Sequence, residues 1–284
     1  MGAVRPPLTL VMVAAAAAVL LVCLVPGFAA EEGKVSFSFA PPEGEALVYK
    51  SSKLDEMVSG GTEITISHSM TLAMSLDEMT EEGDIKLVLS FSEEKASILR
   101  GGALEDFEPD VKLEGETAYV IVDAKGNVMK ADAASNIEGL SSEDELREMV
   151  EDWFVKLPDS AVGVGETWRI DILKKGLAQE GEEPELKGYI DFKLKKVEEK
   201  DGLLIAEIEG KKHVAINRTS QYGKLIAEGK GEIKTKIAVE GGYVVECKRK
   251  TNIKGTIVGQ DPITGRESER KTAITEYFEC ELER

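Results

Sequence analysis

Few side chains of this 284-residue sequence stand in patterns that could do chemistry, and His68 is the first to consider. It is one of two histidines, and the sequence has no serine-nucleophile elbow, zinc-protease motif or glycine-rich phosphate loop to give it a known catalytic role. His68 lies between Ile66 and Met70 on the apolar side of an alternating run. A core histidine with one hydrogen bond, or one that faces a solvated concavity, explains this position without any ligand. We therefore expect a protein that is not an enzyme, with no catalytic residue, no metal ligand and no cofactor.

Cys247 and Cys280 are the next candidates, because the third cysteine, Cys23, lies in the N-terminal apolar run. The turn sequence DPITG lies between their segments and predicts a hairpin in which Asp261 pairs with Arg266. This register sets Cys247 directly opposite Cys280, and it gives three other compatible pairs: Val245 with Leu282, Ile253 with Ile274 and Lys248 with Glu279. Directly opposed residues lie within disulfide range, so we expect a bridge that stabilises the fold by about 2–4 kcal/mol. Two free thiols that pack as small apolar residues are the alternative, because one β-bulge would shift the register.

The segments that carry these residues have the pattern of long antiparallel strands. Residues 64–76 place apolar side chains at even positions and polar ones at most odd positions, which predicts a strand with one buried face. Residues 85–91 continue the pattern, and residues 190–194 and 204–208 show it again on either side of the turn EKDG (199–202). Strands of this length must twist and curl. The predicted fold is therefore mainly β (α+β), with long curved antiparallel sheets.

The apolar face of residues 64–76 would line the inside of such a curl. We expect an apolar cavity there, lined by His68, Met70, Leu72 and Met74, because methionine side chains adapt to ligands of variable shape. The ligand would be a lipid or another apolar small molecule. Methionines on a buried face are also ordinary core residues, which is the alternative interpretation.

Two parts of the chain share one pattern. GEALVYK (44–50) followed by residues 63–98 lines up with GETWRID (165–171) followed by residues 185–216. An internal repeat of this kind predicts two similar structural units. The predicted organisation is a first β-meander half at 31–140, a helix and linker at 141–164, and a second β-meander half at 165–284.

The segment between the halves predicts an amphipathic helix at residues 142–157. Ser142 and Glu145 have the spacing of a capping box, and apolar residues follow at intervals of three and four up to Leu157. Pro158 would end the helix, because the residue before a proline is disfavoured in helical conformation. This helix could fill the concave side of a curled sheet.

Residues 1–30 have the layout of a secretory signal peptide. Arg5 precedes an apolar run from Leu8 to Val25, and small residues and then acids follow. An uncleaved membrane anchor is the alternative, and it would be the only membrane contact of the protein. Both readings place the body of the chain outside the cytoplasm, in the periplasm, on the cell surface or secreted. A net charge of −18 argues against nucleic acid as a partner, and we expect a soluble monomer.

The layout of the whole chain also resembles that of a known group of proteins. A helix that ends in Leu-Pro, followed by V-x-V-G-E-T-W at residues 162–168 in a signal-bearing chain, resembles an uncharacterised family of bacterial secreted or envelope proteins with no assigned activity. The resemblance implies a location outside the cytoplasm. It also implies a β-rich fold distantly similar to the open-barrel lipoprotein carriers of the bacterial envelope, and it implies no functional residues.

Three function classes follow from these observations. The first is a non-catalytic binding protein that holds an apolar ligand or lipid chain on the concave face of a curled sheet. The second is a structural or protein-interaction module of the bacterial envelope, and the third, with the least support, is a hydrolase with an unrecognised site.

Overall fold

The computed structural model describes residues 33–81, 83–174, 186–220, 223–260 and 267–283. The predicted signal peptide at residues 1–30 and the predicted DPITG turn lie outside these ranges. Strands make up most of the described chain, together with one short α-helix. The predicted mainly β fold is therefore confirmed.

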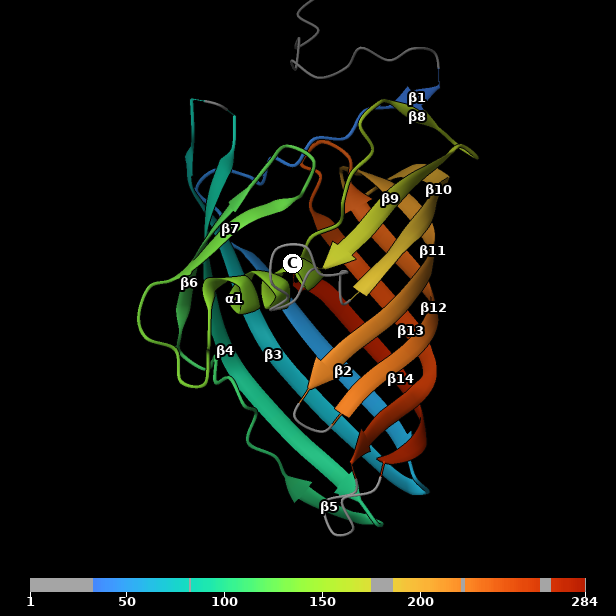
Figure 1. Cartoon of the computed structure of the whole chain (residues 1–284). Coiled ribbons are helices and arrows are strands. Elements are labelled where there is room, and N and C mark those ends of the chain that lie inside the picture. The colour runs from blue at the N-terminus through green and yellow to red at the C-terminus, as the bar shows by residue number, and fades with distance from the viewer. Residues whose placement is uncertain (1–32, 82, 175–185, 221–222, 261–266, 284) are drawn as a thin grey trace, which may run out of the picture.

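One curved antiparallel sheet forms most of the molecule (Figure 1), and a separate pair, β1 and β8, lies at one end. The order in the main sheet is β7-β6-β4-β3-β2-β14-β13-β12-β11-β10-β9, and β5 also pairs with β4. The strands are β1 (Lys34–Val35), β2 (Leu47–Ser59), β3 (Thr62–Met79), β4 (Ile85–Arg100), β5 (Ala103–Asp106), β6 (Thr117–Val122), β7 (Val128–Ala133), β8 (Val162–Gly163), β9 (Thr167–Lys174), β10 (Leu186–Lys200), β11 (Leu203–Ser220), β12 (Gly223–Ala238), β13 (Val244–Gln260) and β14 (Glu267–Glu283).

The predicted hairpins are present. β3 and β4 are adjacent antiparallel strands, with Leu72 opposite Phe91. β10 and β11 meet at the EKDG turn, where Asp201 and Gly202 both have positive φ angles of 53° and 78°. Two successive residues with positive φ form the tight turn whose twist matches that of antiparallel strands, which explains why the chain reverses there.

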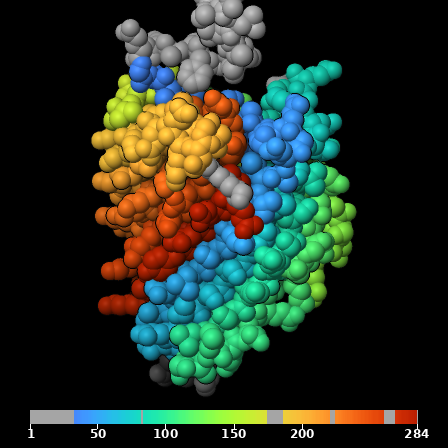
Figure 2. All heavy atoms as spheres, turned by 180° about the vertical axis from the view of Figure 1, so that it is seen from behind, coloured from blue at the N-terminus to red at the C-terminus, as the bar shows by residue number. Residues whose placement is uncertain are grey.

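Pairing between β2 and β14 joins the two ends of the chain into one sheet. Ser51 on β2 lies opposite Cys280 on β14 and also opposite Met70 on β3, so these three side chains share one face. Figure 2 shows the other face of the sheet, over which β12–β14 and β2–β4 run side by side as a continuous surface. We call the face that carries Met70 and Cys280 the inner face and the opposite one the outer face.

The predicted helix is shorter than expected. α1 (Glu143–Val150) is capped by Ser142, whose Oγ accepts from the backbone N–H of Glu145 at 3.2 Å, and the 3-10 turn η1 (Glu151–Trp153) follows. From Phe154 the backbone is extended, so the prediction of a helix to Leu157 and of a stop at Pro158 is wrong. The side chains of residues 153–155 are all buried, and three successive residues cannot share one stripe of a helix.

The main core lies between the inner face of the sheet and the α1 segment. Leu146 and Val150 of α1 pack in the same buried cluster as Leu72 of β3, Leu87 of β4 and Cys247 of β13. Figure 1 shows α1 in front of the upper part of the concave sheet. The helix therefore fills the concave side, as its amphipathic pattern predicted.

Glycines on the inner face allow the second half of the sheet to curl tightly. A Cβ atom on Gly210 would lie 2.8 Å from the ring of Phe192, and one on Gly229 would lie 2.6 Å from Val214. A Cβ atom on Gly255 would lie 2.3 Å from a backbone oxygen of the neighbouring strand. Side chains on the concave side of a curved sheet converge, so a glycine opposite a large residue removes the clash.

Candidate functional site

Three of the four residues predicted to line a cavity are core residues. Met70, Leu72 and Met74 share the inner face as expected, but they are 5%, 0% and 1% exposed and pack in the main core beneath α1. The expected cavity is therefore not formed by these three side chains. His68 lies one position beyond the core on the same face, and its Nε2 lies 2.8 Å from Oε1 of Glu94.

A band of polar side chains, most of them charged, crosses the inner face directly below the core. We call it the polar belt, and its members are Lys53, Asp55, His68, Asp152, Lys212, Arg249 and Glu276. Asp152 comes from η1 and the others from the strands. Lys53 Nζ lies 3.4 Å from Asp55 Oδ2, and Arg249 Nη1 lies 2.9 Å from Asp152 Oδ1.

The pKa values of the polar belt depend on burial and on the charges of neighbouring members. Burial raises the pKa of the Glu276 carboxyl, while the ammonium groups of Lys212 and Lys53 act against this rise. Burial alone would lower the pKa of Lys53, but Asp55 and two more distant carboxylates attract its charge and raise the pKa. The belt is therefore a mutually compensating set of charges that a purely apolar molecule cannot cover without desolvating them.

Below the polar belt the inner face is apolar again. We call this set the lower apolar region, and its members are Met57, Ile64, Ile66, Ile98, Val214, Ile216, Leu225, Ala227, Ile253, Ile257 and Ile274. None of them belongs to the main core or packs against it. Four of them, Ile98, Val214, Ala227 and Ile253, are buried, and the other seven are half-buried. In Figure 1 no helix of the described residues lies over this lower part of the sheet.

Near the belt and the lower apolar region, two polar atoms of the described chain are buried without a hydrogen-bond partner. They are Oδ1 of Asp55, at the belt, and Oγ1 of Thr272, next to the lower apolar region. An unsatisfied buried polar atom costs free energy that a polar group of a bound molecule would reduce.

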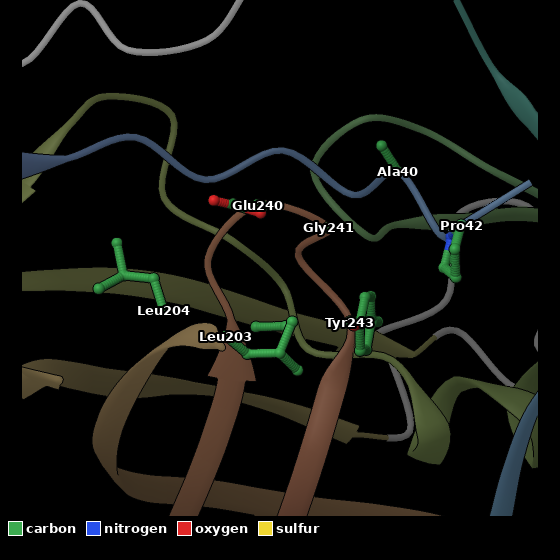
Figure 3. Close-up of a pocket in the computed structure, with 8 residues that line it drawn as sticks. Ala40, Pro42, Leu203, Leu204, Glu240, Gly241 and Tyr243 are labelled. Carbon is green, nitrogen blue, oxygen red and sulfur yellow. The ribbon is translucent and has the colours of Figure 1, made fainter. Parts of the chain in front are cut away.

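Two hollows of the described surface lie elsewhere. One, of about 190 Å³, lies at the upper rim between the segment around Ala40 and Pro42 and the hairpin turns at Leu203 and Gly241 (Figure 3). It presents a single charged side chain, Glu240, and no convergent set of polar groups. The other is lined mainly by outer-face residues of β2, β3 and β14: Ser52, Leu54, Ser67, Ser69, Tyr277 and Glu279. Neither hollow includes the predicted methionines, but His68 and Lys53 also line the second one.

The Glu94 carboxylate forms a site that the sequence analysis missed. Besides its contact with His68, it accepts hydrogen bonds from the backbone N–H groups of Leu113 and Glu114 at 2.9 and 3.0 Å. Glu93 beside it has a φ angle of 56°, and the β3–β4 register shifts there, which identifies a β-bulge. The available signal was a change of alternation, because the inward apolar positions of β4 are odd up to Phe91 and even from residue 96 onward.

The two cysteines have the predicted register but not the predicted bond. Cys247 lies directly opposite Cys280, as Lys248 does to Glu279, yet both cysteines are free thiols, so the predicted disulfide is wrong. The sulfur of Cys247 accepts a hydrogen bond from Nε of Arg249 at 3.3 Å. The neighbouring Cys280 thiol and the Arg249 guanidinium lower the pKa of Cys247 to about 6, and the nearby Cys247 sulfur together with burial raises that of Cys280.

Comparisons with known proteins give no relative from which to transfer a function. No protein-family model matches the chain, and no curated protein matches it. Among the described residues no group of histidine, cysteine and acidic side chains has the arrangement of a metal site. The helical residues of the described ranges include no stretch with the length and hydropathy needed to span a membrane.

Proposed function

We propose that this protein is a non-catalytic binding protein of the cell envelope or the extracellular space, which holds the hydrocarbon part of an apolar ligand against the lower apolar region. The observation that carries the proposal is a set of inner-face apolar side chains outside the main core cluster, most of them half-buried, over which no helix of the described chain lies. The location rests on the signal-like pattern of residues 1–30.

The free energy available at this surface is sufficient for binding. Half-buried side chains such as Ile64, Ile66 and Ile274 still present apolar area to solvent. Removing about 100 Å² of apolar area from water contributes about 2.5 kcal/mol. A hydrocarbon chain laid across several of these residues would cover several times that area, so contacts of this kind favour a lipid over a small polar molecule.

The polar belt sets a boundary for the ligand. A hydrocarbon chain that crossed it would desolvate Lys53, Asp55 and Glu276, at a cost that no apolar contact offsets. We therefore place the ligand between the belt and the β2–β3 turn, with the packed core above the belt unchanged. This position differs from the cavity expected from the sequence, although it is on the same face of β3.

The experiment compares two substitutions at neighbouring positions of β14. Ile274→Glu places a charge in the lower apolar region, and Thr275→Glu places the same charge on the outer face. We expect an environment-sensitive apolar fluorophore to bind the unmodified protein, about tenfold more weakly to Ile274→Glu, and within about twofold of the unmodified protein to Thr275→Glu. Circular dichroism establishes that both variants are folded.

Two outcomes would overturn the proposal. The first is the absence of binding to the unmodified protein, together with organic extracts of the purified protein that contain no lipid by mass spectrometry. The second is an equal effect of Ile274→Glu and Thr275→Glu in two folded variants. Either result would favour the alternative, a structural or protein-interaction module.

A further inference from the structure

Two arginines lie at the lower end of the inner face. Arg100 ends β4 opposite Ile64, and Arg270 lies on β14 opposite Ile257, so both have the inward orientation of the lower apolar region. Both side chains are exposed, and neither forms an ion pair with another described residue. The net charge of the protein is −18, and one carboxylate, that of Glu105 opposite Ile98 on β5, shares the inner face with Arg100. The two arginines supply positive charge at the border of the apolar surface, which favours an anion there over a cation.

The β2–β3 turn lies between the two arginines. β3 and β2 separate β4 from β14, so the strands that carry the two arginines are about 14 Å apart. Arg100 is level with Ile274 in the pairing of these strands, and Arg270 lies four residues, or about 13 Å, further along β14. The two Cα atoms are therefore about 19 Å apart, a distance that two extended arginine side chains with a phosphate group between them can span. Gly60 and Gly61 form the turn with positive φ angles of 58° and 87°. A Cβ atom on Gly60 would lie 3.9 Å from Cδ of Arg270, so the stem of this arginine already lies beside the turn.

The ends of this turn offer further groups for an anion. Ser59 closes β2 and Thr62 opens β3, and both have inner-face positions. Hydroxyl groups and arginine guanidinium groups are the donors that bind phosphate oxygens in proteins. The border between the two arginines is therefore suited to an anionic headgroup.

The width of the lower apolar region indicates more than one hydrocarbon chain. Its half-buried members extend over six neighbouring strands that lie about 4.8 Å apart, so the region is broader than a single extended chain. Along β14 the distance from Arg270 to Glu276 of the belt is six residues, or about 20 Å. The region is therefore wide enough for two hydrocarbon chains side by side, and about 20 Å is the length available to each of them.

We infer that the lower apolar region takes a diacyl phospholipid with a net negative headgroup, whose phosphate lies between Arg100 and Arg270 and whose acyl chains extend toward the polar belt. This inference rests on the proposed function and adds the class and orientation of the ligand. A fatty acid and an anionic phospholipid both carry a negative group on a hydrocarbon chain. The width of the lower apolar region favours the phospholipid, because it has two acyl chains.

The test measures displacement of the apolar fluorophore by short-chain lipids below their micelle concentrations. The lipids are dioctanoyl phosphatidylglycerol, dioctanoyl phosphatidylcholine and octanoate. We expect phosphatidylglycerol to bind at least about tenfold more tightly than phosphatidylcholine, with a preference that decreases as salt is added. Octanoate should be weaker than both.

The matched variants remove two positive charges from opposite faces of the same strands. Arg100→Gln with Arg270→Gln acts on the inner face, and Lys95→Gln with Lys271→Gln acts on the outer face of β4 and β14. The inner pair should abolish the preference for phosphatidylglycerol and weaken phosphatidylcholine binding less, because the choline group already balances the phosphate charge of that lipid, and the outer pair should leave both unchanged.

The outcomes separate this inference from the proposed function. Equal binding of the two phospholipids, or equal effects of the two double variants, would overturn the headgroup assignment while the apolar site remains. Octanoate binding as tight as that of phosphatidylglycerol would overturn the diacyl assignment. Binding of none of the lipids and none of the fluorophore would overturn the proposed function itself.

Discussion

The guanidinium group of Arg249 on β13 lies 2.9 Å from the Asp152 carboxylate on η1, and this ion pair connects the helical segment to the sheet. The same guanidinium lies over the ring of Phe278, 5.2 Å from its centroid, and Trp153 meets that ring edge-on at 6.1 Å. Arg249 also donates to the sulfur of Cys247. One inner-face arginine therefore holds the covering segment, an aromatic pair and the thiol pair together at the border between the core and the polar belt.

Replacing Asp152 by asparagine should weaken this connection. Arg249 is largely buried, with 19% of its side chain exposed, so loss of the carboxylate leaves its charge poorly compensated. We expect Asp152→Asn to lower the free energy of unfolding by about 1–2 kcal/mol in urea denaturation. The control is Asp144→Asn, which removes an exposed pair with Arg147 on α1 and should cost less than about 0.5 kcal/mol. Equal losses in the two variants would show that the Asp152 pair has no special role.

The curvature of the second half should depend on its inner-face glycines. In Gly255→Ala the new methyl group meets the backbone oxygen of Ile226 at 2.3 Å and Cβ of Ala227 at 2.4 Å, and backbone atoms cannot rotate away. We expect a loss of about 1–3 kcal/mol in thermal or urea unfolding. In Gly163→Ala the nearest atom, in the Glu166 side chain, is 3.5 Å away, so stability should stay within about 0.5 kcal/mol. A tolerated Gly255→Ala would mean that the sheet can flatten there.

The Glu94 carboxylate should stabilise the loop that follows β5. Glu94→Ala leaves the backbone N–H groups of Leu113 and Glu114 without their acceptor, so we expect a loss of about 1–3 kcal/mol and faster amide hydrogen exchange at both residues. Glu116→Ala is the control, because Glu116 accepts a hydrogen bond from Ser135 at an exposed site and its loss should cost under about 0.5 kcal/mol. Unchanged exchange in Glu94→Ala would contradict this role.

Local patterns predicted the strands and their faces well. Alternation placed Met70, Leu72 and Met74 on the buried face, and the turn rule opposed Cys247 to Cys280, because a strand has a side-chain period of two and a short loop fixes the register. Such patterns cannot predict which distant strands meet. The pairing of β2 with β14 forms from opposite ends of the sequence, and it turns two meanders into one sheet.

The candidate site was harder to predict than the strands, because it depends on what covers the sheet. The same alternation describes Met70 beneath α1 and Ile66 below the belt, yet only the position of α1 makes the first a core residue and leaves the second half-buried. The early end of α1 adds to this, since it brings Asp152 onto Arg249. The strand register predicted that the two cysteines are opposite each other, but it could not predict whether they form a disulfide. The state of the sulfur of Cys247 depends on its hydrogen bond from Arg249, which comes from a side chain two residues away.

The thiol pair should titrate in two separate steps. The neighbouring Cys280 thiol and the Arg249 guanidinium lower the pKa of Cys247 from 9.0 to about 6, while the pKa of Cys280 is raised. Between pH 6 and 9 the folded chain has lost the Cys247 proton and the unfolded chain retains it, so stability rises with pH in this window. Above pH 9 the unfolded chain loses both thiol protons and the folded one retains that of Cys280, so stability falls again as the pH rises. We expect the wild-type free energy of unfolding to rise more steeply from pH 6 to 9 than that of Cys247→Ser, by at most about 1.4 kcal/mol per pH unit.

Ultraviolet thiolate absorbance of the native protein should appear near pH 6, and both thiols should be alkylated after denaturation without reductant. Absorbance that appears only near pH 9, or a linked Cys247–Cys280 peptide, would contradict the thiolate assignment.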